Sequence, residues 1–305
     1  SSAASDVYKR QGIFCYNSSA LIANNLITEC GYTNATQFSG GGAVAAYNGT
    51  VVLENNAISH CPAQSGGGVY LYQAAAEMRG NRISGSSAHP EYGGTRNGGG
   101  VYALHSSVAM AGNTIEGCEG YVNGGGLYAR FSPVTLAGDS ITANSSTTDG
   151  GGICMDRAAL AASGLAVLNN RAGSGGGGIY LRAAEIELEN AVIAANRSTF
   201  GGGLYADSAW GGIDQNTFDR NSAGFSGGNL MLGSMEPLSV TNNIVSYGER
   251  YGLRTSSLTN IALRYNNLFG NSPSDCHSVT PDATNISRDP RYADTTSFDL
   301  SLIHI

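Results

Sequence analysis

A triple glycine recurs along the chain at nearly constant spacing, and this period limits the possible folds more than any other feature. Successive triplets lie 25 or 26 residues apart, except for one step of 32. They begin at Gly40, Gly66, Gly98, Gly124, Gly150, Gly176 and Gly201, and Gly227-Gly228-Asn229 is a variant. An apolar column keeps the same period, at Ile27, Ile58, Ile83, Ile115, Ile141, Val167, Ile193, Phe218, Ile244 and Leu268. Such a period is typical of repeat architectures, in which each unit buries its apolar face against its neighbours.

Each unit contains short alternating segments that are typical of β-strands. After the glycines comes an apolar–aromatic–apolar run, as in Leu127-Tyr128-Ala129, so the tyrosine faces away from the apolar residues. A second alternating run follows, as in Ile186-Glu187-Leu188, and a third is centred on the apolar column. A βαβ crossover alone needs about a dozen residues, which these units cannot spare. The pattern predicts an all-β parallel β-helix of about ten coils, with three short strands per coil.

Composition supports this fold class and excludes others. The 305 residues include 44 glycines, which weaken helices and so argue against a helical bundle. Acidic residues outnumber basic ones, 23 to 16, so charge does not favour nucleic acid as a partner. No run of about 18 apolar residues occurs, so we expect no membrane span in this segment.

Polar residues mark the corners of the expected coils. Two residues before the apolar column stand Asn25, Asn56, Asn81, Asn113, Asp139, Asn216, Asn242 and Asn266. Because asparagine tolerates left-handed dihedral angles and its amide can bond to an asparagine stacked above, we expect a ladder here. Three residues after the column stand Cys30, Cys61, Ser86, Cys118, Asn144, Asn170, Asn196, Asn221 and Asn271, which mark a second turn.

The two ends of the chain differ from the repeat. Residues 6–11 (DVYKRQ) and 300–305 (LSLIHI) look like read-through of sequencing adapters, and Lys9 is the only lysine of the chain. We therefore expect residues 1–11 and 300–305 to be artefacts. The β-helix domain is then expected over residues 12–299, with a C-terminal end segment from about residue 272, and the chain is expected to be a fragment.

At this level the repeat resembles a known family. Triple glycine followed by an aliphatic residue, paired with Ile-x-x-Asn or with Phe218 to Asn221, resembles the GGA-I and F-x-x-N repeats of polymorphic outer-membrane proteins. The sequence DPRYAD at 289–294 is similar to the DP-x-F-x-D segment that closes such helices. The third glycine, where that family often has alanine, is the main departure. The resemblance implies a right-handed β-helix at the bacterial outer surface or outside the cell.

The same resemblance favours a non-catalytic, adhesin-like or autotransporter-passenger-like module, which we expect to be monomeric and to bind a glycan or a host-surface ligand. A row of outward tyrosines is the candidate binding surface; it consists of Tyr70, Tyr102, Tyr128, Tyr180 and Tyr205, interrupted by Cys154. Such a row either stabilises the sheet by cross-strand stacking or forms a platform for sugar rings or a partner protein. We expect no cofactor and no metal site.

The alternative is a secreted polysaccharide-active enzyme, a lyase or a glycoside hydrolase, on the same fold. Glu185, Glu187 and Glu189 alternate on one strand, and Asp214 lies one coil further. Glu187, Glu189 and Asp214 are the candidate catalytic residues, because stacked carboxylates favour a bound cation or one raised pKa. The other reading of this cluster is a solvated outer face. The Gly-His-Gly motif of pectin hydrolases is absent.

Three further features of the sequence lead to structural predictions. Arg130, Asp156, Arg182 and Asp207 alternate in sign on successive coils and predict a surface ion-pair ladder. Cys30 and Cys61 share a column on adjacent coils, within reach of a disulfide. The corners at 31–39 and 87–97 are enlarged, either as recognition loops or as tolerated insertions.

Overall fold

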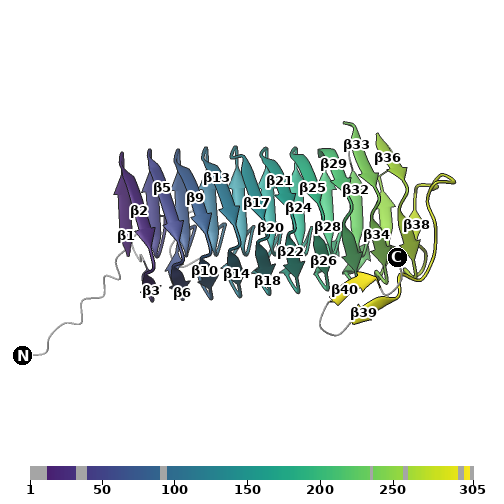
Figure 1. Ribbon diagram of the computed structural model, residues 1–305, viewed down its shortest axis with the longest axis horizontal. Helices are drawn as coiled ribbons and strands as arrows, with labels where there is room; N and C mark the ends of the chain where they lie inside the picture. The colour runs from purple at the N-terminus through teal and green to yellow at the C-terminus, as the bar shows by residue number, and fades with distance from the viewer. Residues whose placement is uncertain are drawn as a thin grey trace, which may run out of the picture.

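The strands stack in parallel into one elongated solenoid (Figure 1). The computed structural model describes residues 12–31, 40–89, 95–233, 236–256, 260–294 and 299–302. These residues contain no helix, and hence no helix that is long and apolar enough to cross a membrane. The predicted all-β parallel β-helix is confirmed.

Three long sheets form the sides of the solenoid. Sheet 1 contains β1 (Ile13–Tyr16), β4 (Val44–Tyr47), β8 (Val69–Tyr72), β12 (Val101–Leu104), β16 (Leu127–Arg130), β20 (Ile153–Asp156), β24 (Ile179–Arg182), β28 (Leu204–Asp207), β32 (Leu230–Gly233), β35 (Leu253–Thr255) and β38 (Cys276–His277). Sheet 2 contains β2 (Ser19–Ala23), β5 (Thr50–Glu54), β9 (Ala75–Arg79), β13 (Ser107–Ala111), β17 (Val134–Ala137), β21 (Ala159–Ser163), β25 (Glu185–Glu189), β29 (Trp210–Asp214), β33 (Leu238–Thr241) and β36 (Ile261–Arg264). Sheet 3 contains β3 (Leu26–Thr28), β6 (Ala57–Ser59), β10 (Arg82–Ser84), β14 (Thr114–Glu116), β18 (Ser140–Thr142), β22 (Ala166–Leu168), β26 (Val192–Ala194), β30 (Thr217–Asp219), β34 (Ile244–Ser246) and β37 (Asn267–Phe269).

A fourth sheet of very short strands corrects the expectation of three strands per coil. It contains β7 (Pro62–Ala63), β11 (Ser87–Ala88), β15 (Glu119–Gly120), β19 (Ser145–Ser146), β23 (Arg171–Ala172), β27 (Arg197–Phe200) and β31 (Ser222–Ser226). Most of these strands have two residues, too few for an alternating pattern to show in the sequence. The enlarged corner at 87–97 begins with β11 of this sheet, whereas residues 32–39 and 90–94 lie outside the described part of the chain.

The apolar column forms the spine of the core. Ile115, Ile141 and Val167 pair in register on β14, β18 and β22, and all three are fully buried. One assignment is wrong: Val245, not Ile244, pairs with Phe218 and Leu268 and is buried.

The triple glycines fill a corner where side chains do not fit. Gly124 has a φ of +63°, in the left-handed region that favours glycine. A Cβ atom at Gly125 would lie 2.3 Å from the carbonyl oxygen of Ser145. The first triplet is in register one residue later than expected, because Val44 pairs with Val69 and the left-handed residue is Gly41. Its third member is therefore Ala43, which makes this triplet Gly-Gly-Ala.

The predicted asparagine ladder is present and buried. The Asn56 amide donates to Oδ1 of Asn81 at 2.9 Å, the Asn81 amide to Asn113 at 2.9 Å, and the Asn113 amide to Asp139 at 2.9 Å. The left-handed residue is not the ladder asparagine but the one before it, as at Asn55 and Gly80. The ladder member near the C-terminus is Asn243 rather than Asn242, because Asn216 donates to it.

A second ladder runs through the other corner. Its members bond in sequence through Asn144, Asn170, Asn196, Asn221, Asn229 and Asn271. Asn229 belongs to the variant triplet, so the asparagine that replaces glycine there continues the ladder.

Asp139 gives the first ladder a pH dependence. Burial raises the pKa of this carboxyl group above its ordinary value of 3.8, against hydrogen bonds from Asn113 and Ala137 that lower it. Because the folded state holds this proton more tightly than the unfolded state, stability falls as the pH rises from about 4 through the raised pKa. We expect Asp139→Asn to remove this contribution, so that unfolding free energies from urea titrations depend less on pH in that window than those of the wild type. Equal slopes for the two proteins would contradict the assignment.

A hairpin of β39 (Tyr292–Asp294) and β40 (Asp299–Leu302) lies against the outside of the C-terminal part of the solenoid (Figure 1). Tyr292 is buried against Ala194 and lies 2.7 Å, hydroxyl to hydroxyl, from Ser246. Ser246 in turn donates to the buried Asp219 at 2.7 Å. The assignment of residues 1–11 and 300–305 as artefacts stays a prediction; residues 1–11 and 303–305 lie outside the described chain.

Candidate functional site

The tyrosine row is a stacked column, but it is not an exposed platform. Tyr102, Tyr128 and Tyr180 are only 4%, 4% and 8% exposed, and Tyr70 and Tyr205 are half-buried. The rings of Tyr70 and Tyr102 stack with centroids 5.0 Å apart, and those of Tyr102 and Tyr128 are 5.4 Å apart. Of the two interpretations of this row, the structure therefore favours cross-strand stacking that stabilises sheet 1 over an exposed platform.

Glycines at the preceding corners cover these rings. A Cβ atom at Gly40 would lie 2.2 Å from Cδ2 of Tyr70, and one at Gly175 would lie 2.7 Å from Cδ1 of Tyr205. The corner backbone thus packs directly on the ring faces that a ligand would need.

The predicted ion-pair ladder is present in part. Asp156 accepts from Arg182 at 2.7 Å and lies 3.2 Å from Nε of Arg130, and its side chain is only 2% exposed. It is therefore a buried centre between two arginines rather than one step of a surface ladder. Asp207 accepts instead from the Tyr180 hydroxyl at 3.3 Å.

The cysteines do not form the disulfide that the spacing allows. Cys30 and Cys61 follow Ile27 and Ile58, which pair in register, so both lie in one column on adjacent coils. All six cysteines are free thiols in this structure. Burial raises the pKa of Cys61 to about 11, which keeps it protonated at neutral pH.

The structure places the three candidate catalytic carboxylates on two neighbouring strands of sheet 2. Glu187 and Glu189 are exposed on β25, and Asp214 pairs with Glu189 on β29. Asp214 accepts hydrogen bonds from Thr241 at 2.6 Å, Asn242 at 2.8 Å and Gln215 at 2.9 Å. Burial raises the pKa of Asp214, but these three hydrogen bonds outweigh it and lower the pKa below its ordinary value. Asp214 is therefore held ionised, which does not suit a general acid.

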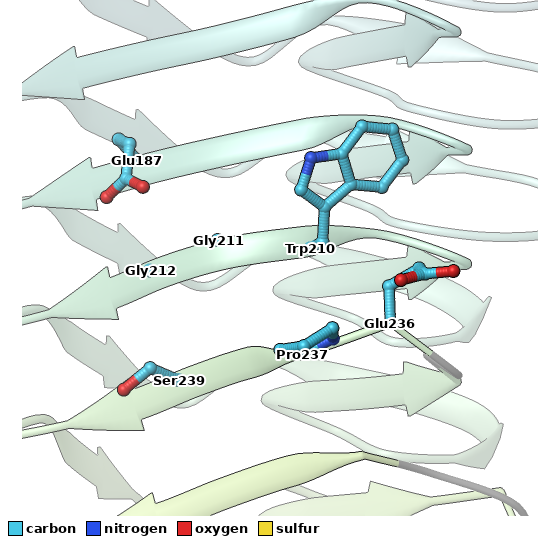
Figure 2. A pocket seen from close by; sticks show the side chains of 7 residues that line it. All are labelled: Glu187, Trp210, Gly211, Gly212, Glu236, Pro237 and Ser239. Atoms are coloured by element: carbon cyan, nitrogen blue, oxygen red, sulfur yellow. The ribbon is translucent and has the colours of Figure 1, made fainter.

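An open groove of about 720 Å³ lies instead on the outer face of sheet 2 (Figure 2). It is lined by Glu187, Trp210, Gly211, Gly212, Glu236, Pro237 and Ser239. Gly212 pairs with Glu187 on one side and Ser239 on the other, so the middle strand of the three has no side chain at this position. The bare backbone of Gly212 therefore forms the floor of the groove. Neither Glu189 nor Asp214 lines it.

Trp210 stands at one side of this groove. It is the only tryptophan of the chain and is 37% exposed. Figure 2 shows its indole rising from β29, with Glu187 on the preceding strand and Glu236 and Pro237 on the following coil. The carboxylate of Glu187 leans over the floor, since a Cβ atom at Gly212 would lie 2.7 Å from its Oε2.

A second depression of about 430 Å³ adjoins the groove and shares Trp210 with it. The residues that line it include Phe131, Arg157, Ala159, Glu185 and Trp210. The Phe131 ring stacks on His105, with centroids 5.1 Å apart, and the Arg157 guanidinium carbon lies 5.7 Å from the Phe131 centroid.

Sequence reasoning missed most of this site. Glu187 was identified, but Trp210, Glu236, Pro237, Ser239 and Phe131 were not. Two signals in the sequence point to it, namely the unique tryptophan and the Gly211-Gly212 pair, which replaces alternating residues in a strand.

The comparisons with known proteins agree with the architecture. Residues 11–181 match the model of the right-handed β-helix region, and residues 111–285 match the model of the periplasmic copper-binding protein NosD. A search of curated proteins returned no match. Each family match covers more than half of the chain, in agreement with the parallel stack of sheets described above. The chain belongs to the family of right-handed β-helix proteins, with a C-terminal part that matches the NosD model.

Proposed function

We propose that this protein is a non-catalytic, adhesin-like binding module of the bacterial envelope or outer surface, and that it binds saccharides in the groove at Trp210. The observation that carries the proposal is the partly exposed indole of Trp210, which stands beside a groove whose floor is the glycine backbone at Gly212. Sugar rings stack on such aromatic faces, while carboxylates and hydroxyls at the rim bind the sugar hydroxyl groups. Glu187, Glu236 and Ser239 provide these polar groups.

The cellular location that we propose is supported by similarity to two protein families. The name of the NosD model describes a periplasmic protein, which supports a place in the cell envelope. The Gly-Gly-Ala triplet at Gly41 to Ala43 adds to the resemblance to polymorphic outer-membrane proteins, which supports the outer surface.

Copper binding, which the name of the NosD model also mentions, does not fit the residues that are present. The described part of the chain holds no group of three or more His, Cys, Asp or Glu side chains arranged for a metal ion. Two of its histidines stack on aromatic rings, His105 on Phe131 and His277 on Tyr251. We therefore derive no function from copper.

A second candidate is glycoside hydrolysis in the same groove. The observation that favours it is that two carboxylates, those of Glu187 and Glu236, line one groove, as the acid and base of a glycosidase do. Product formation from a glycan that binds, lost in Glu187→Gln, would promote this candidate over the binding module.

The proposed binding site can be tested with the tryptophan itself. Because Trp210 is the only tryptophan, titration with a saccharide that enters the groove should shift its fluorescence. By calorimetry, Trp210→Ala should weaken binding of that saccharide roughly 2- to 10-fold, the effect of losing one aromatic contact.

Phe225→Ala is the matched control, since Phe225 is 62% exposed and does not line the groove. It should bind like the wild type. If a panel of bacterial and host glycans leaves the fluorescence unchanged, or if both variants bind equally, the groove is not the binding site.

A further inference from the structure

The two depressions beside Trp210 carry an excess of negative charge. Among the described residues that line them, three are carboxylates, Glu185, Glu187 and Glu236, and one is a guanidinium, Arg157. Glu185 and Glu187 are exposed and lie on one strand, two residues apart. Glu189, also exposed, continues the same outer face. A ligand that stacks on Trp210 therefore meets a negative rim.

Resting on the proposed function, we propose that the ligand is a cationic oligosaccharide, a chain of amino sugars whose amino groups are free. The charge complementarity argues for it: an ammonium group on a stacked sugar ring would lie among these carboxylates. The same rim repels uronic acid chains, so a polyuronate is the disfavoured ligand.

The arrangement suits a chain rather than a single sugar. The shared Trp210 joins the two depressions into one path along sheet 2, from Pro133, directly before β17, to Ser239 on β33. These strands are four strand spacings apart, about 19 Å, which is room for several sugar rings. Trp210 lies where the two depressions meet, and Phe131 lines the second depression.

Arg157 is the one guanidinium among the described residues that line the two depressions, and the three carboxylates outnumber it. Its guanidinium stacks near the ring of Phe131, which leaves its remaining N–H groups as donors for sugar hydroxyls. At this end of the path Glu185 lines the same depression and offsets its charge.

The test compares three oligosaccharides of equal length with the full chain: a chitosan oligomer, its fully N-acetylated counterpart and an oligogalacturonate. Binding is followed by Trp210 fluorescence in mildly acidic buffer, where the amines are protonated. We expect the chitosan oligomer to bind most tightly and to lose affinity as salt screens the charges. The double variant Glu187→Gln, Glu236→Gln should lose about 10-fold in affinity for the chitosan oligomer and little for the acetylated one, since only the first depends on charge.

Glu119→Gln is the matched control, because Glu119 is an exposed carboxylate on β15, outside both depressions. Tighter binding of the acetylated or uronic acid oligomer would overturn the inference and leave the proposed function intact. No response of Trp210 to any of the three, or to the wider glycan panel, would overturn both. If oligolysine displaced the chitosan oligomer and bound more tightly with the same dependence on Glu187 and Glu236, a basic peptide would be the occupant instead.

Discussion

Ile141→Asp is expected to abolish cooperative folding of the solenoid around β18. Ile141 is fully buried between Ile115 and Val167, so the carboxylate would have no solvent and no cationic partner in the core column. An unpaired buried charge costs several kcal/mol, a large share of the ~5–15 kcal/mol by which a typical domain is stable. Because each coil contacts only its neighbours, the loss also removes the stacking surface for the coils on either side.

Thermal melting followed by circular dichroism measures this effect. The matched control is Thr135→Asp, which places the same charge on the exposed outer face of β17. The control should melt within a few degrees of the wild type. A melting curve of Ile141→Asp that resembles the control would refute the assignment of the core column.

Asn113→Ala is expected to have the second largest effect, through the ladder. The Asn113 amide donates to the Met78 carbonyl at 2.8 Å, and Oδ1 of Asn113 accepts from the backbone and the side chain of Asn81 at 2.8 and 2.9 Å. Alanine removes these three bonds and leaves the backbone N–H of Asn81 and the Met78 carbonyl without their Asn113 partner. Oδ1 of Asp139 loses the side-chain amide of Asn113 but keeps the bond from the backbone N–H of residue 113 at 2.7 Å. With about 1–3 kcal/mol for each buried polar group that loses its partner, and some relaxation, we expect a loss of about 3–5 kcal/mol.

Urea unfolding gives the magnitude, and Thr135→Ala is the control because Thr135 is exposed on the outer face. A surface substitution of this kind is usually within about 0.5 kcal/mol of the wild type. Equal losses for the two variants would mean that the ladder bonds contribute no net stability.

Much of the scaffold could be predicted because its determinants repeat. The apolar column at Ile115 and Ile141 and the ladder from Asn56 to Asp139 recur once per coil, so one period places them in register. Where the period shifts by a residue, as at Gly41 and Val245, the sequence pattern alone was misleading. The short strands of the fourth sheet, such as β15, were missed because two residues carry no periodicity.

The candidate site depended on features that do not repeat. Alternation correctly placed Tyr128 and Glu187 outside the core, but it does not state whether the outer position is open to solvent. Tyr128 is buried because the corner backbone and the neighbouring rings cover it, whereas Glu187 faces a groove because Gly212 beside it has no side chain. The sequence by itself thus determined the coil, its core and its polar ladders, which follow from short-range periodicity. Only the tertiary structure decided which outer surface is accessible, because accessibility depends on side chains and corners contributed by neighbouring coils.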